Sequence, residues 1–165
     1  MEDALYTSHL VLRRPQLSDA DAIVRALNDA EVSKWLTQVP YPYGHADAVA
    51  FINGQTNAPT LLICQNDTPI GCIGTRGEFG YWLGHAYWGQ GIMSEASQAV
   101  LDWHFETAAT PLQSGHAIGN DRSRRVLLKM GFEDTGIVDR RHQMTGALRR
   151  QQVITLTHTQ WTNRA

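Results

Sequence analysis

The stretch Gly80-Tyr-Trp-Leu-Gly-His-Ala-Tyr-Trp-Gly-Gln-Gly-Ile-Met-Ser-Glu-Ala96 is the most unusual part of the sequence, and it predicts a strand, a turn and the start of a helix. The turn carries Gly84, Gly89 and Gly91, which let the backbone approach a ligand closely and turn several N–H groups the same way. The first turn of a helix adds N–H donors and a favourable dipole. The segment is therefore a candidate cradle for a phosphate or pyrophosphate, although an ordinary tight connection gives the same pattern.

Two common nucleotide-binding motifs do not fit this segment. A dinucleotide fingerprint needs a third glycine in the helix and a parallel βαβ unit, whereas the glycines here are followed by Ser94. A P-loop requires a Gly-Lys pair followed by Ser or Thr, and the chain contains no Gly-Lys pair.

The sequence on both sides of the segment predicts an α/β domain. Upstream, β-rich runs at residues 60–65, 70–75 and 78–83 are separated by short turns, so they should pair as an antiparallel meander. The remaining predicted strands cover residues 9–13, 112–117, 132–138 and 151–157. Hydrophobic spacings of three and four predict helices near residues 18–27, 29–36, 45–52, 91–107 and 121–130.

Length and composition predict a single domain that spans residues 1–165. Of the 165 residues, 42% are hydrophobic and 18% are charged. No apolar run approaches the roughly 20 residues that cross a bilayer, and no signal-peptide pattern opens the chain, so we expect a cytoplasmic protein without a membrane partner. The net charge of −2 disfavours broad nucleic-acid binding. Cys64 and Cys72 are expected to be buried free thiols, and no His/Cys spacing indicates a metal site.

Short motifs follow one another along nearly the whole chain, at residues 10–15, 17–20, 35–36, 40–43, 80–84, 87–91, 94–96, 120–123, 129–132 and 156–161. This ordered set resembles the GNAT superfamily of acyl-CoA-dependent N-acetyltransferases, and most closely the branch that acetylates the N-termini of ribosomal proteins. The resemblance implies a GNAT fold of the α/β (α+β) class. Its central sheet is mixed but mostly antiparallel, has about seven strands with helices on both faces, and splays between the fourth and fifth strands.

The resemblance also implies that acetyl-CoA is a cosubstrate and assigns residues to its site. The family's pyrophosphate loop has Gln or Arg, two free positions, Gly, a free position, and Gly or Ala. These positions fall on Trp88, Gly91 and Met93, of which only Gly91 matches strictly, but the loop binds phosphate mainly through backbone N–H groups. The implied contacts with acetyl-CoA are Tyr81, Trp82, Leu83, Gly89, Gln90, Gly91, Ile92, Met93, Ser94, Asn120, Ser123, Arg125 and Lys129.

By the same resemblance, the amine attacks the thioester directly in a ternary complex, which requires a base for the ammonium and an acid for the departing thiolate. Many family members place a tyrosine four residues before the Gly-Phe pair, but that position is Leu127 here. Ser123 is therefore the candidate acid, with a helix-capping hydroxyl as its alternative role. Glu78 is the first candidate base and His116 the second, and either one could instead be structural.

The acceptor amine should bind near Trp35, Tyr41 and Tyr43 and the arginine-rich connection of residues 140–150. This set could hold a peptide end, a nucleotide sugar or an acidic metabolite, or it could consist of packed aromatics and solvated arginines. Two other classes of protein stay open: a catalytically silent acyl-CoA-binding module, and a nucleic-acid-binding protein that uses the arginine clusters. The sequence leaves the acceptor, either a protein N-terminus or a small-molecule amine, and the formation of a homodimer undecided.

Overall fold

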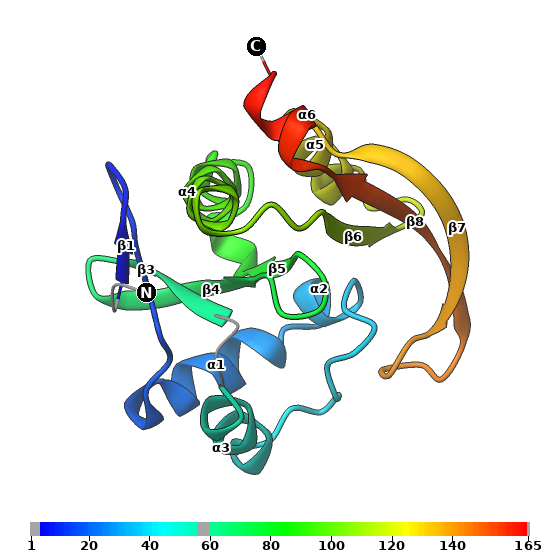
Figure 1. Ribbon diagram of the computed structural model, residues 1–165. Coiled ribbons are helices and arrows are strands. Elements are labelled where there is room, and N and C mark those ends of the chain that lie inside the picture. Colours follow the sequence, from blue (N-terminus) through cyan, green and yellow to red (C-terminus); the bar gives the residue numbers. More distant parts are fainter. Residues whose placement is uncertain (1–3, 56–59, 165) are drawn as a thin grey trace.

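A computed structural model of the protein describes residues 4–55 and 60–164, in which strands are covered by helices on both faces (Figure 1). The strands are β1 (Ala4–Tyr6), β2 (Val11–Arg13), β3 (Thr60–Gln65), β4 (Thr68–Gly74), β5 (Gly80–Leu83), β6 (Leu112–Ala117), β7 (Glu133–Arg141) and β8 (Leu148–Leu156). The α-helices are α1 (Ala20–Leu27), α2 (Ala30–Ser33), α3 (His45–Asn53), α4 (Ile92–Thr107), α5 (Asp121–Lys129) and α6 (His158–Thr162). Single 3₁₀ turns, η1 (Leu17–Asp19) and η2 (His85–Tyr87), precede α1 and α4.

The strands form two sheets, of order β1-β2-β3-β4-β5 and β6-β8-β7. All pairings within these two sheets are antiparallel. The predicted strands at residues 78–83 and 112–117, the fourth and fifth of the sequence analysis, correspond to β5 and β6, and the sheet divides between them. The predicted fold class and the splay are therefore confirmed, with β1 as one additional strand.

Two hydrophobic cores lie on opposite faces of the larger sheet because successive side chains of a strand point to opposite sides. Leu61 and Ile63 of β3 belong to the core that α4 covers, whereas Leu62 and Cys64 belong to the core that α1 and α3 cover. Figure 1 shows α4 on one side of β4, and α1 and α3 on the other. Within the described residues, no helix has the length and apolar character required to cross a membrane.

The structure differs from the sequence prediction most at the C-terminal hairpin. Residues 140–150 were expected to be a connection, but β7 extends to Arg141 and β8 begins at Leu148. Nearly every residue of β7 is exposed, so the strand shows no alternation of buried and exposed side chains that a sequence pattern could reveal. The predicted helix at residues 29–36 is also shorter in the structure, where α2 ends at Ser33.

Asp19 fixes the backbone just before α1 through hydrogen bonds to its carboxylate. Its carboxylate accepts hydrogen bonds from both terminal nitrogens of Arg13, at 2.8 and 2.9 Å, and from the backbone N–H of Gln16, at 2.7 Å. Burial alone would raise the pKa of this carboxyl group, but the hydrogen bonds from Arg13 and Gln16 outweigh burial and leave the pKa below its ordinary value. A carboxyl group with a lowered pKa in the folded state stabilises the fold above its unfolded pKa, and this contribution is lost as the pH falls through the folded pKa.

We therefore expect Asp19→Asn to lower the free energy of unfolding by about 2 kcal/mol at neutral pH, since charged hydrogen bonds are lost. Between neutral pH and about pH 3, below the ordinary pKa of an aspartate, the variant should lose less stability than the parent. Urea unfolding at both pH values measures this difference. Asp21→Asn changes an exposed carboxylate in the first turn of α1 and is the control. The same pH dependence in the parent and in Asp19→Asn would contradict the assignment.

Candidate functional site

A cleft of about 720 Å³ lies where the sheet divides. Residues 80–83 of β5 and residues 115–117 of β6 line it, together with the turn before α4, the starts of α4 and α5, and the segment after α2. The cleft brings together most of the residues that the sequence analysis selected: Trp35, Glu78, Tyr81, Trp82, Leu83, Gly89, Gly91, Ile92, Met93, Ser94, His116, Asn120, Ser123, Arg125 and Lys129.

Three of the selected residues lie outside the lining of the cleft. The side-chain amide of Gln90 is exposed and donates to the carbonyl oxygen of Ala86 at 3.0 Å. Tyr43 is only 6% exposed and belongs to the core beneath α1 and α3, where burial raises the pKa of its hydroxyl to about 12. Tyr41 is half-buried and also lies outside the lining. The structure thus supports the packing role that the sequence left open for Tyr43.

The turn before α4 has the geometry expected of an anion cradle. Gly89 and Gly91 have φ angles of +73° and +79°, a conformation that side chains other than glycine rarely adopt. A Cβ atom built on either glycine would meet no atom within 4 Å, so the space above the turn is open. Gly91 is the N-cap of a 16-residue helix, whose first N–H groups have no partner inside the helix. The turn can therefore bind a phosphate through its backbone.

Basic side chains of α5 lie beside this turn. Arg125 and Lys129 line the cleft and are exposed. The guanidinium carbon of Arg122 lies 3.9 Å from the ring centroid of Trp88, which stands in the turn itself. The indole N–H of Trp88 donates to the carbonyl oxygen of Leu83 at 2.8 Å, which fixes the ring. The contact between Arg122 and Trp88 was not predicted from the sequence.

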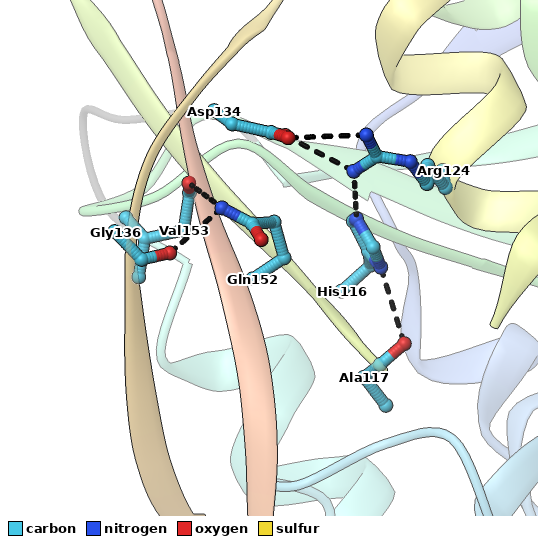
Figure 2. Close-up of polar contacts among 7 residues, drawn as sticks. All are labelled: His116, Ala117, Arg124, Asp134, Gly136, Gln152 and Val153. Carbon is cyan, nitrogen blue, oxygen red and sulfur yellow. Dashed lines mark hydrogen bonds and ion pairs between the residues drawn. The ribbon is translucent and has the colours of Figure 1, made fainter. Parts of the chain in front are cut away.

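His116 is 5% exposed and is held from both sides (Figure 2). Its Nδ1 lies 3.1 Å from the carbonyl oxygen of Ala117, and its Nε2 lies 3.4 Å from a guanidinium nitrogen of Arg124. A carbonyl can only accept and a guanidinium can only donate, so the ring carries its proton on Nδ1 and accepts at Nε2. Arg124 is in turn fixed by Asp134, with two contacts of 3.0 Å. The lone pair that a general base needs is thus already engaged by Arg124.

Glu78 forms a two-point ion pair with Arg140 from β7. The two carboxylate oxygens accept from the two terminal nitrogens of Arg140 at 2.5 and 3.1 Å. This hydrogen-bonded pair raises the pKa of the guanidinium, which burial only partly opposes. The side chain of Glu78 keeps 35% of its surface exposed, so water can reach the carboxylate. The pair spans 62 positions in the sequence, and the sequence analysis did not predict it.

Ser123 lies in the first turn of α5, but Asn120 is the residue that caps this helix. The side-chain oxygen of Asn120 accepts from the backbone N–H of Ser123 at 3.3 Å. The hydroxyl of Ser123 instead lies 3.0 Å from the hydroxyl of Tyr81, which comes from β5. Of the two roles that the sequence left open for Ser123, the structure gives helix capping to Asn120. Within the described residues, no group of three or more His, Cys, Asp and Glu side chains is placed to hold a metal ion.

Comparisons with known proteins agree with this geometry. A family model described as "Acetyltransferase (GNAT) domain" matches residues 9–133. The uncharacterized N-acetyltransferase p20 of Bacillus licheniformis is 30% identical over 152 residues, which cover 82% of this chain and 85% of p20. The uncharacterized N-acetyltransferase YoaA of Bacillus subtilis is 28% identical over 152 residues, with 81% of this chain and 85% of YoaA covered.

Solved structures share the fold at lower sequence identity. RimL, a ribosomal L7/L12 α-N-protein acetyltransferase in complex with coenzyme A, has a TM-score of 0.82 and 19% identity, covering 93% of this chain and 97% of its own. MccE, a microcin C7 self-immunity acetyltransferase in complex with acetyl-CoA and AMP, has a TM-score of 0.79 and 18% identity, covering 92% and 93%. At these identities the likeness shows the fold.

The tautomer of His116 is a direct test of the cleft geometry. We expect the proton on Nδ1 and a bare Nε2, because of the carbonyl of Ala117 and the guanidinium of Arg124. Nitrogen chemical shifts of isotope-labelled protein at mildly alkaline pH report the tautomer. His104 is an internal control that should carry its proton on Nε2 instead, since this atom lies 2.9 Å from the carbonyl oxygen of Thr110. A proton on Nε2 of His116 would contradict the arrangement.

Proposed function

This chain belongs to the GNAT acetyltransferase family, and we propose that it binds acetyl-CoA in the cleft between β5 and β6 and transfers the acetyl group to a primary amine. The observation that carries the proposal is the open turn at Gly89 and Gly91 at the N-terminus of α4. A pyrophosphate on this turn would receive backbone N–H donors and face the positive end of the helix dipole. Arg122, Arg125 and Lys129 add positive charge on the same side of the cleft.

The free edge of β5 is the second part of the donor site. β5 pairs with β4 along one edge, and its residues 80–83 also line the cleft. The amide groups of the pantetheine arm can pair with backbone N–H and C=O groups on such an edge as an added strand would. A backbone N–H of residues 81–83 would then face the thioester carbonyl and stabilise the charge that develops on its oxygen.

Glu78 is the general base that the geometry supports best. His116 already uses its Nε2 lone pair on Arg124, whereas Glu78 is reachable by water. An alkyl ammonium with a pKa near 10 must lose a proton before it attacks. The fixed carboxylate of Glu78 attracts the ammonium and takes its proton through water before the attack, and Arg140 keeps the carboxylate in place.

The acceptor end of the cleft supports a peptide N-terminus or an amine on an apolar chain. Apolar side chains from α2, the segment after it and α3 line this end: Val32, Trp35, Leu36, Val39 and Phe51. The nearby arginines are largely occupied within the protein, which weakens the case for an acidic metabolite. Arg140 pairs with Glu78, Arg141 donates to the carbonyl of Gly146, and Arg149 donates to the carbonyl of Lys34.

Calorimetric titration with acetyl-CoA tests the donor site without knowledge of the acceptor. We expect the parent to bind with a Kd in roughly the micromolar range. Gly91→Glu should weaken binding at least about 100-fold, or about 3 kcal/mol, because a carboxylate enters the phosphate site and the backbone is strained. Gly146→Glu is the matched control, since Gly146 also has a positive φ and open space but lies in the β7–β8 turn. A folded parent that does not bind acetyl-CoA would refute the proposed function.

Turnover with a panel of amines, followed by release of free thiol, tests the chemistry. With the best acceptor, Glu78→Gln should lower kcat by about 100-fold or more, because the proton acceptor is lost. Glu133→Gln, which changes an exposed carboxylate at the start of β7, should leave the rate unchanged. A change of less than about threefold in Glu78→Gln would exclude Glu78 as the base. Binding without thiol release for every amine would support the silent-module alternative.

A further inference from the structure

A tyrosine hydroxyl reaches Ser123 from across the cleft. In many relatives the tyrosine that protonates the leaving thiolate would stand on α5 at position 127, which is Leu127 here and lies fully buried in the core. Tyr81 of β5 brings its hydroxyl to 3.0 Å from Oγ of Ser123 and 3.2 Å from the carbonyl oxygen of the same residue. Both residues line the cleft. The hydroxyl of Tyr81 therefore lies at the first turn of α5, where the candidate acid Ser123 stands, although Tyr81 itself belongs to β5.

The Tyr81 ring is held in place by its surroundings, so its hydroxyl has a fixed position. The ring packs against the core covered by α4 and meets Phe79 edge-on at a centroid distance of 5.8 Å. Burial raises the pKa of the Tyr81 hydroxyl well above its ordinary value, and the hydrogen bond with Ser123 opposes this effect only in part. Tyr81 therefore keeps its proton and acts as a hydrogen-bond donor throughout the neutral and mildly alkaline range.

Two arrangements of the hydroxyl protons satisfy these contacts, and they differ in whether the proton of Ser123 can point into the cleft. In the first, Ser123 donates to Tyr81 and Tyr81 donates to the Ser123 carbonyl, so both protons are used inside the protein. In the second, Tyr81 donates to Oγ of Ser123, and the serine proton is free to point into the cleft. The exchange requires only the rotation of two hydroxyl groups. A negative charge in the cleft selects the second arrangement because a donor then faces it.

We propose that Tyr81 is a positioning residue that turns the Ser123 hydroxyl toward the departing thiolate. The proposal rests on the proposed function, since it requires coenzyme A in this cleft. As the C–S bond breaks, its electron pair stays on sulfur and the proton of Ser123 Oγ moves to sulfur. The hydrogen bond from Tyr81 stabilises the serine oxygen during this transfer. The oxygen then regains, through water, the second proton that the amine releases after its attack, so an ammonium and a thioester yield an amide, a thiol and the one proton that Glu78 took.

The thiol of bound coenzyme A provides a test that needs no acceptor amine. The thiolate absorbs in the near ultraviolet, so a pH titration of the complex gives the acid dissociation constant of the bound thiol. In the parent, the Ser123 donor should make the bound thiol a stronger acid than free coenzyme A, since hydrogen bonding favours the charged form. Tyr81→Phe, which removes only the hydroxyl, should lower this dissociation constant about tenfold, as expected for the loss of one charge-assisted hydrogen bond.

Further variants distinguish the positioning of the Ser123 hydroxyl by Tyr81 from a purely structural hydrogen bond between β5 and α5. Ser123→Ala should lower the acid dissociation constant of the bound thiol at least as much as Tyr81→Phe does. The double variant should match Ser123→Ala, because Tyr81 acts through the serine. Ser123→Thr keeps a hydroxyl and should stay near the parent. Tyr6→Phe removes an exposed tyrosine hydroxyl outside the lining of the cleft and should also stay near the parent. With the best acceptor amine, Tyr81→Phe should reduce kcat while the KM for acetyl-CoA stays within about twofold.

The outcomes distinguish the two levels of the proposal. If coenzyme A does not bind to the folded parent, both the proposed function and the role of Tyr81 fall. If coenzyme A binds equally to the parent and to Tyr81→Phe, and the thiol dissociates equally in both, Tyr81 is only a tether and the inference is overturned. If Tyr81→Phe does not fold, the pair Ser123→Ala and Ser123→Thr carries the test. Equal acid dissociation constants of the bound thiol in Ser123→Ala and Ser123→Thr would overturn the inference.

Discussion

Two hydrogen bonds at the beginning of β5 and β6 set the geometry on which the cleft depends. The backbone N–H of Phe79 donates to the carbonyl of Gln113 at 2.7 Å, and the Ser114 hydroxyl donates to the carbonyl of Phe79, also at 2.7 Å. Phe79 is almost fully buried and stacks on Phe132, so the junction cannot slide. Beyond it the sheet divides, and an edge of β5 faces the cleft. Backbone groups on such an edge need partners, and this is why we propose that the division binds the amide groups of the pantetheine arm.

The polar side chains around the cleft are ordered before any substrate arrives. His116 is fixed by Ala117 and Arg124, and Glu78 is fixed by Arg140. Each of these contacts limits what the side chain can do: the Nε2 lone pair of His116 is occupied by Arg124, whereas water still reaches the carboxylate of Glu78. Donors and charges held in place in this way need no reorganisation during the reaction, which is where much of the catalytic advantage of an enzyme arises.

Local features of the sequence were sufficient to predict the turn and the meander, whereas the division of the sheet was predicted only from the family resemblance. The glycines of residues 84–91, the short turns around β3, β4 and β5, and the apolar spacing of α4 are all encoded within a few neighbouring residues. Contacts between distant positions were not predictable in this way. Tyr81 and Ser123 are 42 positions apart, and Glu78 and Arg140 are 62 apart. Tyr43 shows the same limit, since an aromatic residue beside a proline fits a binding pocket as well as a core.

Trp88 shows why a missing motif residue does not by itself argue against a function. The family resemblance implies Gln or Arg at this position, so Trp88 takes the place of a polar side chain at the proposed phosphate site. In the structure, however, the guanidinium of Arg122 stacks on the Trp88 ring at 3.9 Å. Stacking uses the face of the guanidinium and leaves its N–H groups free in the plane. The proposed phosphate site requires a cation beside the glycine turn. Arg122 of α5 provides that cation, although the sequence of the turn contains neither Arg nor Lys.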